Sequence, residues 1–287
     1  MSQSANLPPR SAGILDLRLW VGSSPWRLAP AWTLLAGLVL SGDWSFRPGN
    51  LARVLLALLL VEGLWGAIWG QLLVLSQVAF RGSRLTNSHS APSWPYATAD
   101  APLARLWRWL QGSEDGYLTR DVWIALVLAG AASVMLGRAA VLASVMVALL
   151  ALAATAFNPL YPRLTRFLGA LVTVALPWWL GMNLLASGAT AWWPQPAQQA
   201  VWLLMAAFTL LAFAGEELAA GGSQAWLWAG HVALVAVLAL AEERTAAIAT
   251  AATLVVPSVR AGRSDPEHLG RWHLLALTVA VVVLRLG

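Results

Sequence analysis

The sequence predicts an all-α, polytopic membrane protein. Of its 287 residues, 59% are hydrophobic and only 11% are charged, and the mean hydropathy is +0.67. A water-soluble chain of this length cannot bury so much apolar surface, so the lipid bilayer must act as its solvent. The absence of cysteine also excludes disulfides, thiolate metal sites and cysteine nucleophiles.

The sequence contains nine apolar segments that are candidates to cross about 30 Å of hydrocarbon as helices. They cover approximately residues 26–41, 51–78, 119–137, 139–157, 164–187, 197–220, 224–242, 245–259 and 271–286. The first and eighth are short, and Pro257 is expected to end the eighth because proline breaks a helix interior. We therefore predict one transmembrane helical domain at 26–287, preceded by an N-terminal cytoplasmic segment at 1–25.

The basic residues predict the orientation of these helices. All 18 are arginine, and cytoplasmic segments of membrane proteins carry the excess of basic residues. A cytoplasmic N-terminus leaves only five arginines outside, namely Arg47, Arg53, Arg138, Arg244 and Arg285. The other 13 then lie inside, which favours an N-inside, C-outside topology in the bacterial inner (cytoplasmic) membrane.

The longest break in hydrophobicity, residues 80–116, is cytoplasmic in this topology. Residues 83–95 are rich in Ser, Asn and Pro and predict an irregular loop. Residues 101–112 place leucines and Trp107 on one helical face and arginines away from it. This pattern is typical of a short helix in the membrane interface. The helix either anchors the loop or forms a lid over a cavity that opens to the cytoplasm.

Three segments resemble a known family. Residues 25–32 (PWRLAPAW) with 35–42 (LAGLVLSG), residues 158–166 (NPLYPRLTR) and residues 175–181 (ALPWWLG) resemble UbiA-type intramembrane prenyltransferases, nearest the chlorophyll and bacteriochlorophyll synthase branch. The resemblance implies a nine-transmembrane-helix bundle with a cytoplasmic N-terminus. It also implies that helices two and six lie beside each other and share one cytoplasm-side cavity, with Gln71 and Glu216 facing it.

Members of that family hold a prenyl diphosphate through magnesium ions bound to two aspartate-rich motifs. In this chain no Asp or Glu follows an Asn or Asp by four positions, so the first motif is absent. Gln71 stands where it would begin, followed by apolar residues that cannot bind Mg²⁺. The second motif is reduced to Glu216 and Glu217, which either bind metal or simply reach water at a helix end. Mg²⁺ is thus implied only if the chain is catalytically active, and we assign no catalytic residue.

Arg163, Arg166 and Tyr161 match family positions that contact the diphosphate. Arginine suits phosphate through its bidentate fork. Anchoring at a cytoplasmic helix end explains the two arginines equally well.

Polar groups inside the predicted helices supply the remaining candidates. Glu62 shares one helical face with Trp65 and Trp69, and either lines the cavity or is a protonated acid bonded across helices. His231 could ligate the magnesium of a chlorin or pack as a neutral residue. Trp178 offers a flat wall for a polyprenyl chain or tetrapyrrole, and Asn183 is a weaker candidate.

Two functions follow. The first is a pseudoenzyme, a UbiA-like integral membrane protein that binds an isoprenoid, quinone or (bacterio)chlorophyll-type ligand in an intramembrane cavity. It would act as an accessory subunit of a membrane complex. The second is a divergent prenyltransferase that joins a prenyl diphosphate to an aromatic or tetrapyrrole acceptor. The missing carboxylates favour the first. Neither involves nucleic acid.

Overall fold

The computed structural model describes residues 29–42, 47–70, 72–73, 116–157, 161–185, 199–240, 244–260 and 266–286. Within these residues it is helical, without strands, and has a helix at each of the nine predicted ranges. The helices are α1 (Pro30–Ser41), α2 (Pro48–Leu58) continuing through the π-helix η1 (Leu59–Leu64) to residue 70, α5 (Gly116–Leu136), α6 (Arg138–Phe157), α7 (Pro162–Ala170) continuing through the π-helix η2 (Leu171–Ala175) into α8 (Leu176–Asn183), α9 (Gln199–Ala219), α10 (Ala225–Leu240), α11 (Arg244–Arg260) and α12 (Pro266–Leu286). The predicted segment 1–25, and the predicted loop and interfacial helix at 80–115, lie outside the described residues.

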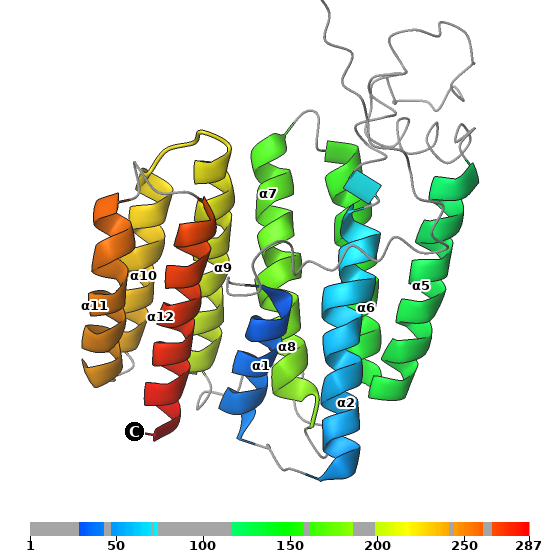
Figure 1. The fold of residues 1–287 in the computed structure, drawn as a ribbon, viewed down its shortest axis with the longest axis horizontal. Helices are drawn as coiled ribbons and strands as arrows, with labels where there is room; N and C mark the ends of the chain where they lie inside the picture. Colours follow the sequence, from blue (N-terminus) through cyan, green and yellow to red (C-terminus); the bar gives the residue numbers. More distant parts are fainter. Residues whose placement is uncertain are drawn as a thin grey trace, which may run out of the picture.

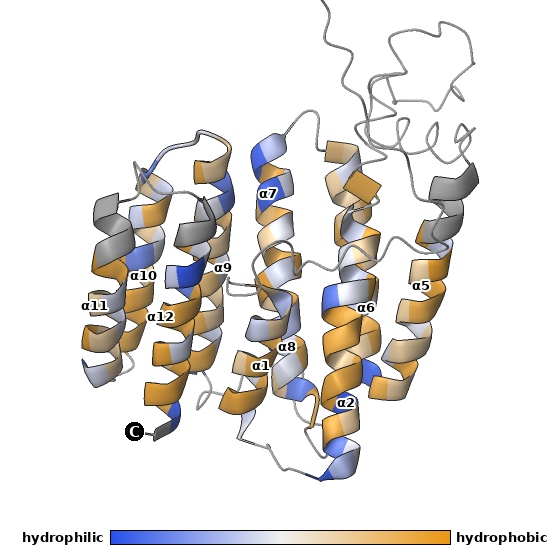
Figure 2. Cartoon of the chain, viewed as in Figure 1, coloured by the Kyte–Doolittle hydropathy of each residue, from blue (hydrophilic) through white to orange (hydrophobic). Residues whose placement is uncertain are grey.

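Four of these helices are long and apolar enough to cross a membrane: Pro48–Gly70, Arg138–Phe157, Pro162–Asn183 and Gln199–Ala219. Four shorter helices are also apolar, and hydrophobic residues cover most of the bundle between its two ends (Figure 2). The all-helical, membrane-type fold is therefore confirmed. The nine-span count and the cytoplasmic N-terminus stay predictions.

The helices run roughly parallel or antiparallel to one another, with α9 to α12 on one side of the bundle and α2, α5 and α6 on the other (Figure 1). Helices α1, α7 and α8 lie between these two groups. Each side has its own apolar core, and α1 contributes Leu34 and Leu38 to one core and Ala36 to the other. Helix α1 therefore joins the two halves of the bundle.

Helix α1 has 12 residues, which corresponds to about 18 Å at 1.5 Å per residue. It begins partway along the bundle and ends near the chain's C-terminus (Figure 1). It packs closely against α8 through two glycines. A Cβ atom on Gly37 would lie 2.1 Å from the carbonyl oxygen of Trp178, and one on Gly181 would lie 2.1 Å from the carbonyl oxygen of Leu34. Only glycine permits this backbone approach.

Both π-helical segments contact α1. The backbone N–H of Ala31 donates to Glu62 Oε1 in η1 at 2.7 Å. The hydroxyl of Thr33 lies 3.1 Å from the carbonyl oxygen of Thr173 in η2 and donates to it. The wider turns of a π-helix disturb the regular hydrogen-bond ladder and often mark functional regions. Here they lie beside the start of α1.

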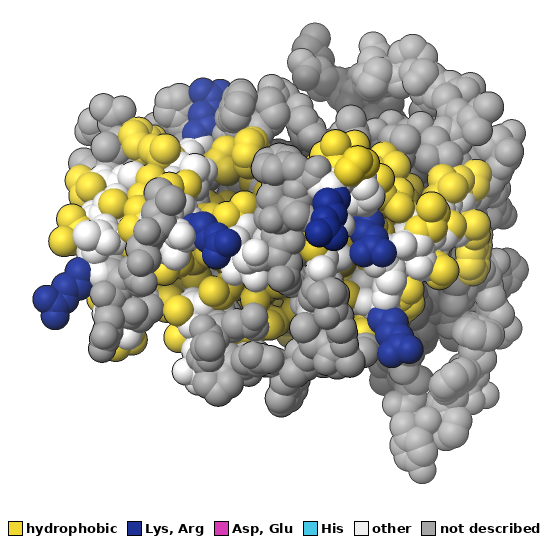
Figure 3. Space-filling view, turned by 90° about the horizontal axis from the view of Figure 1, so that it is seen from below, with side chains coloured by type: hydrophobic (Ala, Val, Ile, Leu, Met, Phe, Trp, Pro, Cys, Tyr) yellow, Lys and Arg dark blue, Asp and Glu magenta, His cyan; other side chains and the backbone are white. Residues whose placement is uncertain are grey.

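The five arginines predicted on the outer side belong to one end of the bundle, where α2 and α11 begin and α12 ends (Figure 1). All five are exposed, and Figure 3 shows arginine side chains among hydrophobic ones on this end face. Arg163 and Arg166 lie at the opposite end, near the start of α7. These described arginines of the two predicted groups thus lie at opposite ends of the bundle. The side of the membrane that each end faces stays a prediction.

Candidate ligand cavity

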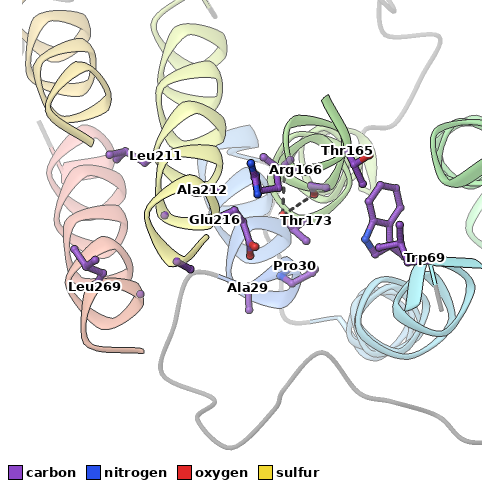
Figure 4. Close-up of a pocket in the computed structure, with 16 residues that line it drawn as sticks. Ala29, Pro30, Trp69, Thr165, Arg166, Thr173, Leu211, Ala212, Glu216 and Leu269 are labelled. Atoms are coloured by element: carbon purple, nitrogen blue, oxygen red, sulfur yellow. Dashed lines mark hydrogen bonds between the residues drawn. The ribbon is translucent and has the colours of Figure 1, made fainter. Parts of the chain in front are cut away.

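A cavity of about 390 Å³ lies among α1, α2, α7, α9 and α12 (Figure 4). Small-molecule sites in proteins commonly enclose about 300–1,000 Å³. Its walls combine apolar side chains with a few polar ones. The lining residues are Ala29, Pro30, Trp69, Leu73, Thr165, Arg166, Gly169, Ala170, Thr173, Leu211, Ala212, Gly215, Glu216, Ala219, Leu269 and Gly270.

Helix α7 and η2 form one wall of the cavity. Thr165, Gly169 and Thr173 follow at intervals of four residues, so they lie along one helical face. Opposite them is the ring of Trp69, whose Cζ2 atom would lie 3.5 Å from a Cβ atom on Gly169. The aromatic ring therefore rests close to the α7 backbone and narrows the cavity on that side.

An ion-pair cluster occupies the polar end. Glu217 is almost fully buried, with 1% of its side chain exposed, and its Oε1 accepts a 2.6 Å hydrogen bond from Arg166 Nε. Arg163 Nε lies 3.5 Å from the other oxygen, Oε2, although the Arg163 side chain is 73% exposed. The two arginines predicted to bind diphosphate and one glutamate predicted to bind metal thus face each other. Charge-assisted pairing of this kind is strong where water is scarce.

The end of α9 explains the burial of Glu217. Gly221 has a φ of 77°, in the left-handed region that terminates helices. The N–H of Gly222 then donates to the carbonyl oxygen of Glu217 at 2.7 Å. A Cβ atom on Gly222 would lie 3.0 Å from Glu217 Oε2, so the two glycines close the chain over the carboxylate.

Glu216 behaves differently from its neighbour. Its side chain is exposed and lines the cavity beside Arg166 (Figure 4). Adjacent residues on a helix point about 100° apart, which separates the two carboxylates. Within the described residues no group of three or more His, Cys, Asp or Glu side chains is placed to hold a metal ion.

Two hydrogen-bond donors face the cavity. Thr165 is 7% exposed, and its Oγ1 has no hydrogen-bond partner among the described residues. Arg166 is 25% exposed and makes its ion pair through Nε. Its two terminal nitrogens make no hydrogen bond to the part of the chain that is described. A buried hydroxyl without a partner is unusual, because the lost hydration is not replaced.

Of the residues predicted on helix two, Glu62 and Trp65 lie outside the lining. Glu62 is buried in η1 and bonds the start of α1. The fully buried Trp65 donates from Nε1 to Ser144 Oγ at 2.8 Å, and Ser144 in turn lies 2.7 Å from Ser133 Oγ. Trp69 lines the cavity, and Gln71 lies outside the described residues. Helices α2 and α9 reach the cavity from opposite sides of α7 (Figure 4), so the prediction that helices two and six lie beside each other is wrong, although both contribute to the lining of one cavity.

Four further candidates lie away from the cavity lining. His231 is buried between α10 and α12, with its Nε2 atom 3.4 Å from Nε2 of His273. Trp178 is fully buried and stacks on Phe208 with ring centroids 6.1 Å apart. The other two have local contacts: Asn183 donates to the carbonyl oxygen of Trp179 at 2.8 Å, and exposed Tyr161 lies beside Phe157.

Sequence reasoning identified Trp69, Arg166 and Glu216 in the lining but missed Thr165. A threonine within a helix commonly bonds its own backbone, so its sequence context gave no signal. His273 was also missed, because its partner His231 lies 42 residues earlier in the chain.

The described residues thus form an all-helical structure of membrane type, with four helices long and apolar enough to cross a bilayer and a cavity of small-molecule size. No protein-family model, curated protein or solved structure matches this chain.

Proposed function

We propose that this chain is a UbiA-like membrane protein that holds an isoprenoid, quinone or pigment-type molecule in its cavity without transferring prenyl groups. The observation that carries the proposal is the pairing of Glu217 with Arg166 and Arg163. A buried carboxylate that is hydrogen-bonded to Arg166 and ion-paired with Arg163 is a poor magnesium ligand. It also compensates one of the two positive charges, so these arginines attract a diphosphate, with its several negative charges, less than two unpaired arginines would.

The cavity walls support an apolar ligand. Trp69, Leu211 and Leu269 present aromatic and aliphatic surface, which suits a ring and an isoprenoid chain. His231, the candidate axial ligand for a chlorin, is paired with His273 elsewhere in the bundle. Among the proposed ligands, the lining therefore favours an isoprenoid or quinone over a pigment.

A divergent prenyltransferase is the second candidate, because Glu216 remains in the cavity with its carboxylate exposed beside Arg166. One carboxylate with water and phosphate oxygens can hold a magnesium ion. That enzyme would join a prenyl diphosphate to an aromatic or tetrapyrrole acceptor with one metal motif instead of two.

Two measurements test the proposal. Mass spectrometry of protein purified in mild detergent should identify a copurifying lipid-soluble molecule. A Gly215→Leu variant should lose that molecule, because Gly215 lines the cavity and a side chain there meets no atom within 4 Å. Gly130→Leu is the matched control, since Gly130 is exposed on α5 and also has open space around it.

The second measurement separates the two functions. Protein given prenyl diphosphates, Mg²⁺ and aromatic or chlorin acceptors should release no pyrophosphate above background. Magnesium-dependent release that disappears in a Glu216→Gln variant would establish the prenyltransferase instead.

A further inference from the structure

The hydroxyl of Thr165 points to the kind of head group that the cavity takes. It lies in the lining, is more than nine-tenths buried, and has no partner in the described part of the chain. A buried donor without a partner is costly, so such a group is usually satisfied by a ligand or a water molecule. A hydroxyl that served only the fold would bond a backbone carbonyl, as Thr155 does with Ala151 at 2.8 Å.

Arg166 supplies further donors elsewhere in the lining. It is the next residue on α7, and its guanidinium group points toward α9, whereas Thr165 lies on the side of α7 nearer Trp69 (Figure 4). Its Nε is engaged by Glu217, whereas a guanidinium group carries five N–H donors in total. The hydrogen-bonded pair of Arg166 and buried Glu217 carries no net charge, and the third member, Arg163, is largely exposed to solvent. That combination suits a neutral oxygen better than an anion.

We infer that the cavity binds a quinone-type head group, with the Thr165 hydroxyl donating to one of its carbonyl oxygens. This inference rests on the proposed ligand-binding function and narrows its ligand. A carbonyl oxygen accepts two hydrogen bonds through its two lone pairs and brings no hydrogen of its own. A hydrocarbon would leave the Thr165 hydroxyl unpaired, and a diphosphate would bring several negative charges to a cluster in which Glu217 already compensates one of the two arginines.

The apolar lining accommodates the rest of such a molecule. The ring of Trp69 stands across from the α7 face that carries Thr165 (Figure 4), so a flat ring can stack on it. Leu211 and Leu269 lie on α9 and α12, where they can contact an isoprenoid or alkyl tail.

The test is equilibrium binding of decylubiquinone to the full chain in lipid nanodiscs. Thr165→Val replaces the hydroxyl with a methyl group of similar size. It should weaken quinone binding about tenfold, because the buried carbonyl oxygen of the quinone then loses one hydrogen-bond donor. Thr165→Ser should bind within about twofold of the wild type, and Thr155→Val, which removes a backbone-bonded hydroxyl that is not part of the lining, should change nothing.

The melting temperature of the protein without ligand distinguishes a hydroxyl that binds ligand from one that stabilises the fold. Thr165→Val should melt at the same temperature as the wild type or higher, since an unpartnered buried hydroxyl is removed. A large drop in the melting temperature would assign Thr165 a structural role and overturn the inference.

Two other probes keep this inference distinct from the proposed function. The inference would be wrong, with the proposed function still standing, if Thr165→Val bound the quinone as tightly as the wild type. It would also be wrong if the protein bound geranylgeraniol but not decylubiquinone. Tighter binding of geranylgeranyl diphosphate than of the quinone would also defeat it. Magnesium-dependent release of pyrophosphate is the separate outcome that would defeat the proposed function.

Discussion

Glu62 Oε1 accepts a 2.7 Å hydrogen bond from the backbone N–H of Ala31, so a carboxyl group of η1 caps the beginning of α1. Helix α1 begins inside the bundle, where its first N–H groups cannot rely on water. Pro30 at the first position has no N–H to satisfy. The acidic side chain at the positive end of the helix dipole therefore has a structural reason to lie in the membrane interior.

The first prediction concerns this cap. Glu62→Ala should lower the free energy of unfolding by about 1–2 kcal/mol, the range for losing a helix-capping side chain. Glu62→Gln should retain most of that stability because its carbonyl oxygen can still accept from Ala31. The measurement is unfolding in mixed detergent micelles. Equal stability of the alanine variant and the wild type would show that the cap contributes nothing.

The sequence predicted the helices well because long apolar runs have few alternatives in a bilayer. Each of the nine windows overlaps a helix in the described residues, but the expected helix end at Pro257 is wrong, since α11 continues to Arg260. The π-helical segments were not anticipated, since their register depends on contacts with α1 that local sequence does not report. Thr33 bonding to Thr173, 140 residues away, is such a contact.

The cavity was predicted less completely, because its lining also depends on contacts between residues far apart in the sequence. Helix amphipathicity and intramembrane charge identified Trp69 and Glu216 as candidates. The same reasoning treated Glu216 and Glu217 as one motif, although the helix turns Glu217 onto Arg166 and leaves Glu216 exposed. Which neighbour satisfies a buried charge depends on tertiary packing, and a single sequence does not contain that information.

The second prediction concerns the α1–α8 contact. Gly37→Ala and Gly181→Ala should each destabilise the protein by about 1–3 kcal/mol or more, because the added methyl group would meet backbone atoms at 2.1 Å and the helices must separate. Thermal unfolding in the same detergent measures the effect. Gly130→Ala, with nothing within 4 Å, should be neutral or slightly stabilising. Loss of stability in the control but not at Gly181 would contradict the packing described for α1.

The third prediction concerns orientation. The chain has no cysteine, so single cysteines report their position without background. Gln224, between α9 and α10, and Thr245, at the start of α11, are both exposed and lie at opposite ends of the bundle. If the N-terminus is cytoplasmic, a membrane-impermeant maleimide should label Thr245→Cys in intact cells, whereas Gln224→Cys should be labelled only after the cells are lysed. The reverse pattern would invert the proposed topology.

The last prediction compares the two adjacent glutamates. Glu217→Gln should lower the free energy of unfolding by about 1–3 kcal/mol, because it leaves Arg166 without its buried counter-charge while that arginine keeps partial access to solvent. Glu216→Gln should change it by less than about 0.5 kcal/mol, as expected for an exposed side chain. Both are measured by denaturant titration in the same micelles.

A double-mutant cycle identifies the interaction responsible. If the Arg166–Glu217 pair accounts for the loss, Arg166→Met combined with Glu217→Met should be more stable than Glu217→Met alone, since the only charge then left without its partner is that of the exposed Arg163. Additive losses from the two methionine substitutions would mean that the residues act independently. Equal effects of the Glu216 and Glu217 substitutions would contradict the distinct roles that burial assigns to them, and would return both carboxylates to a shared metal-binding role.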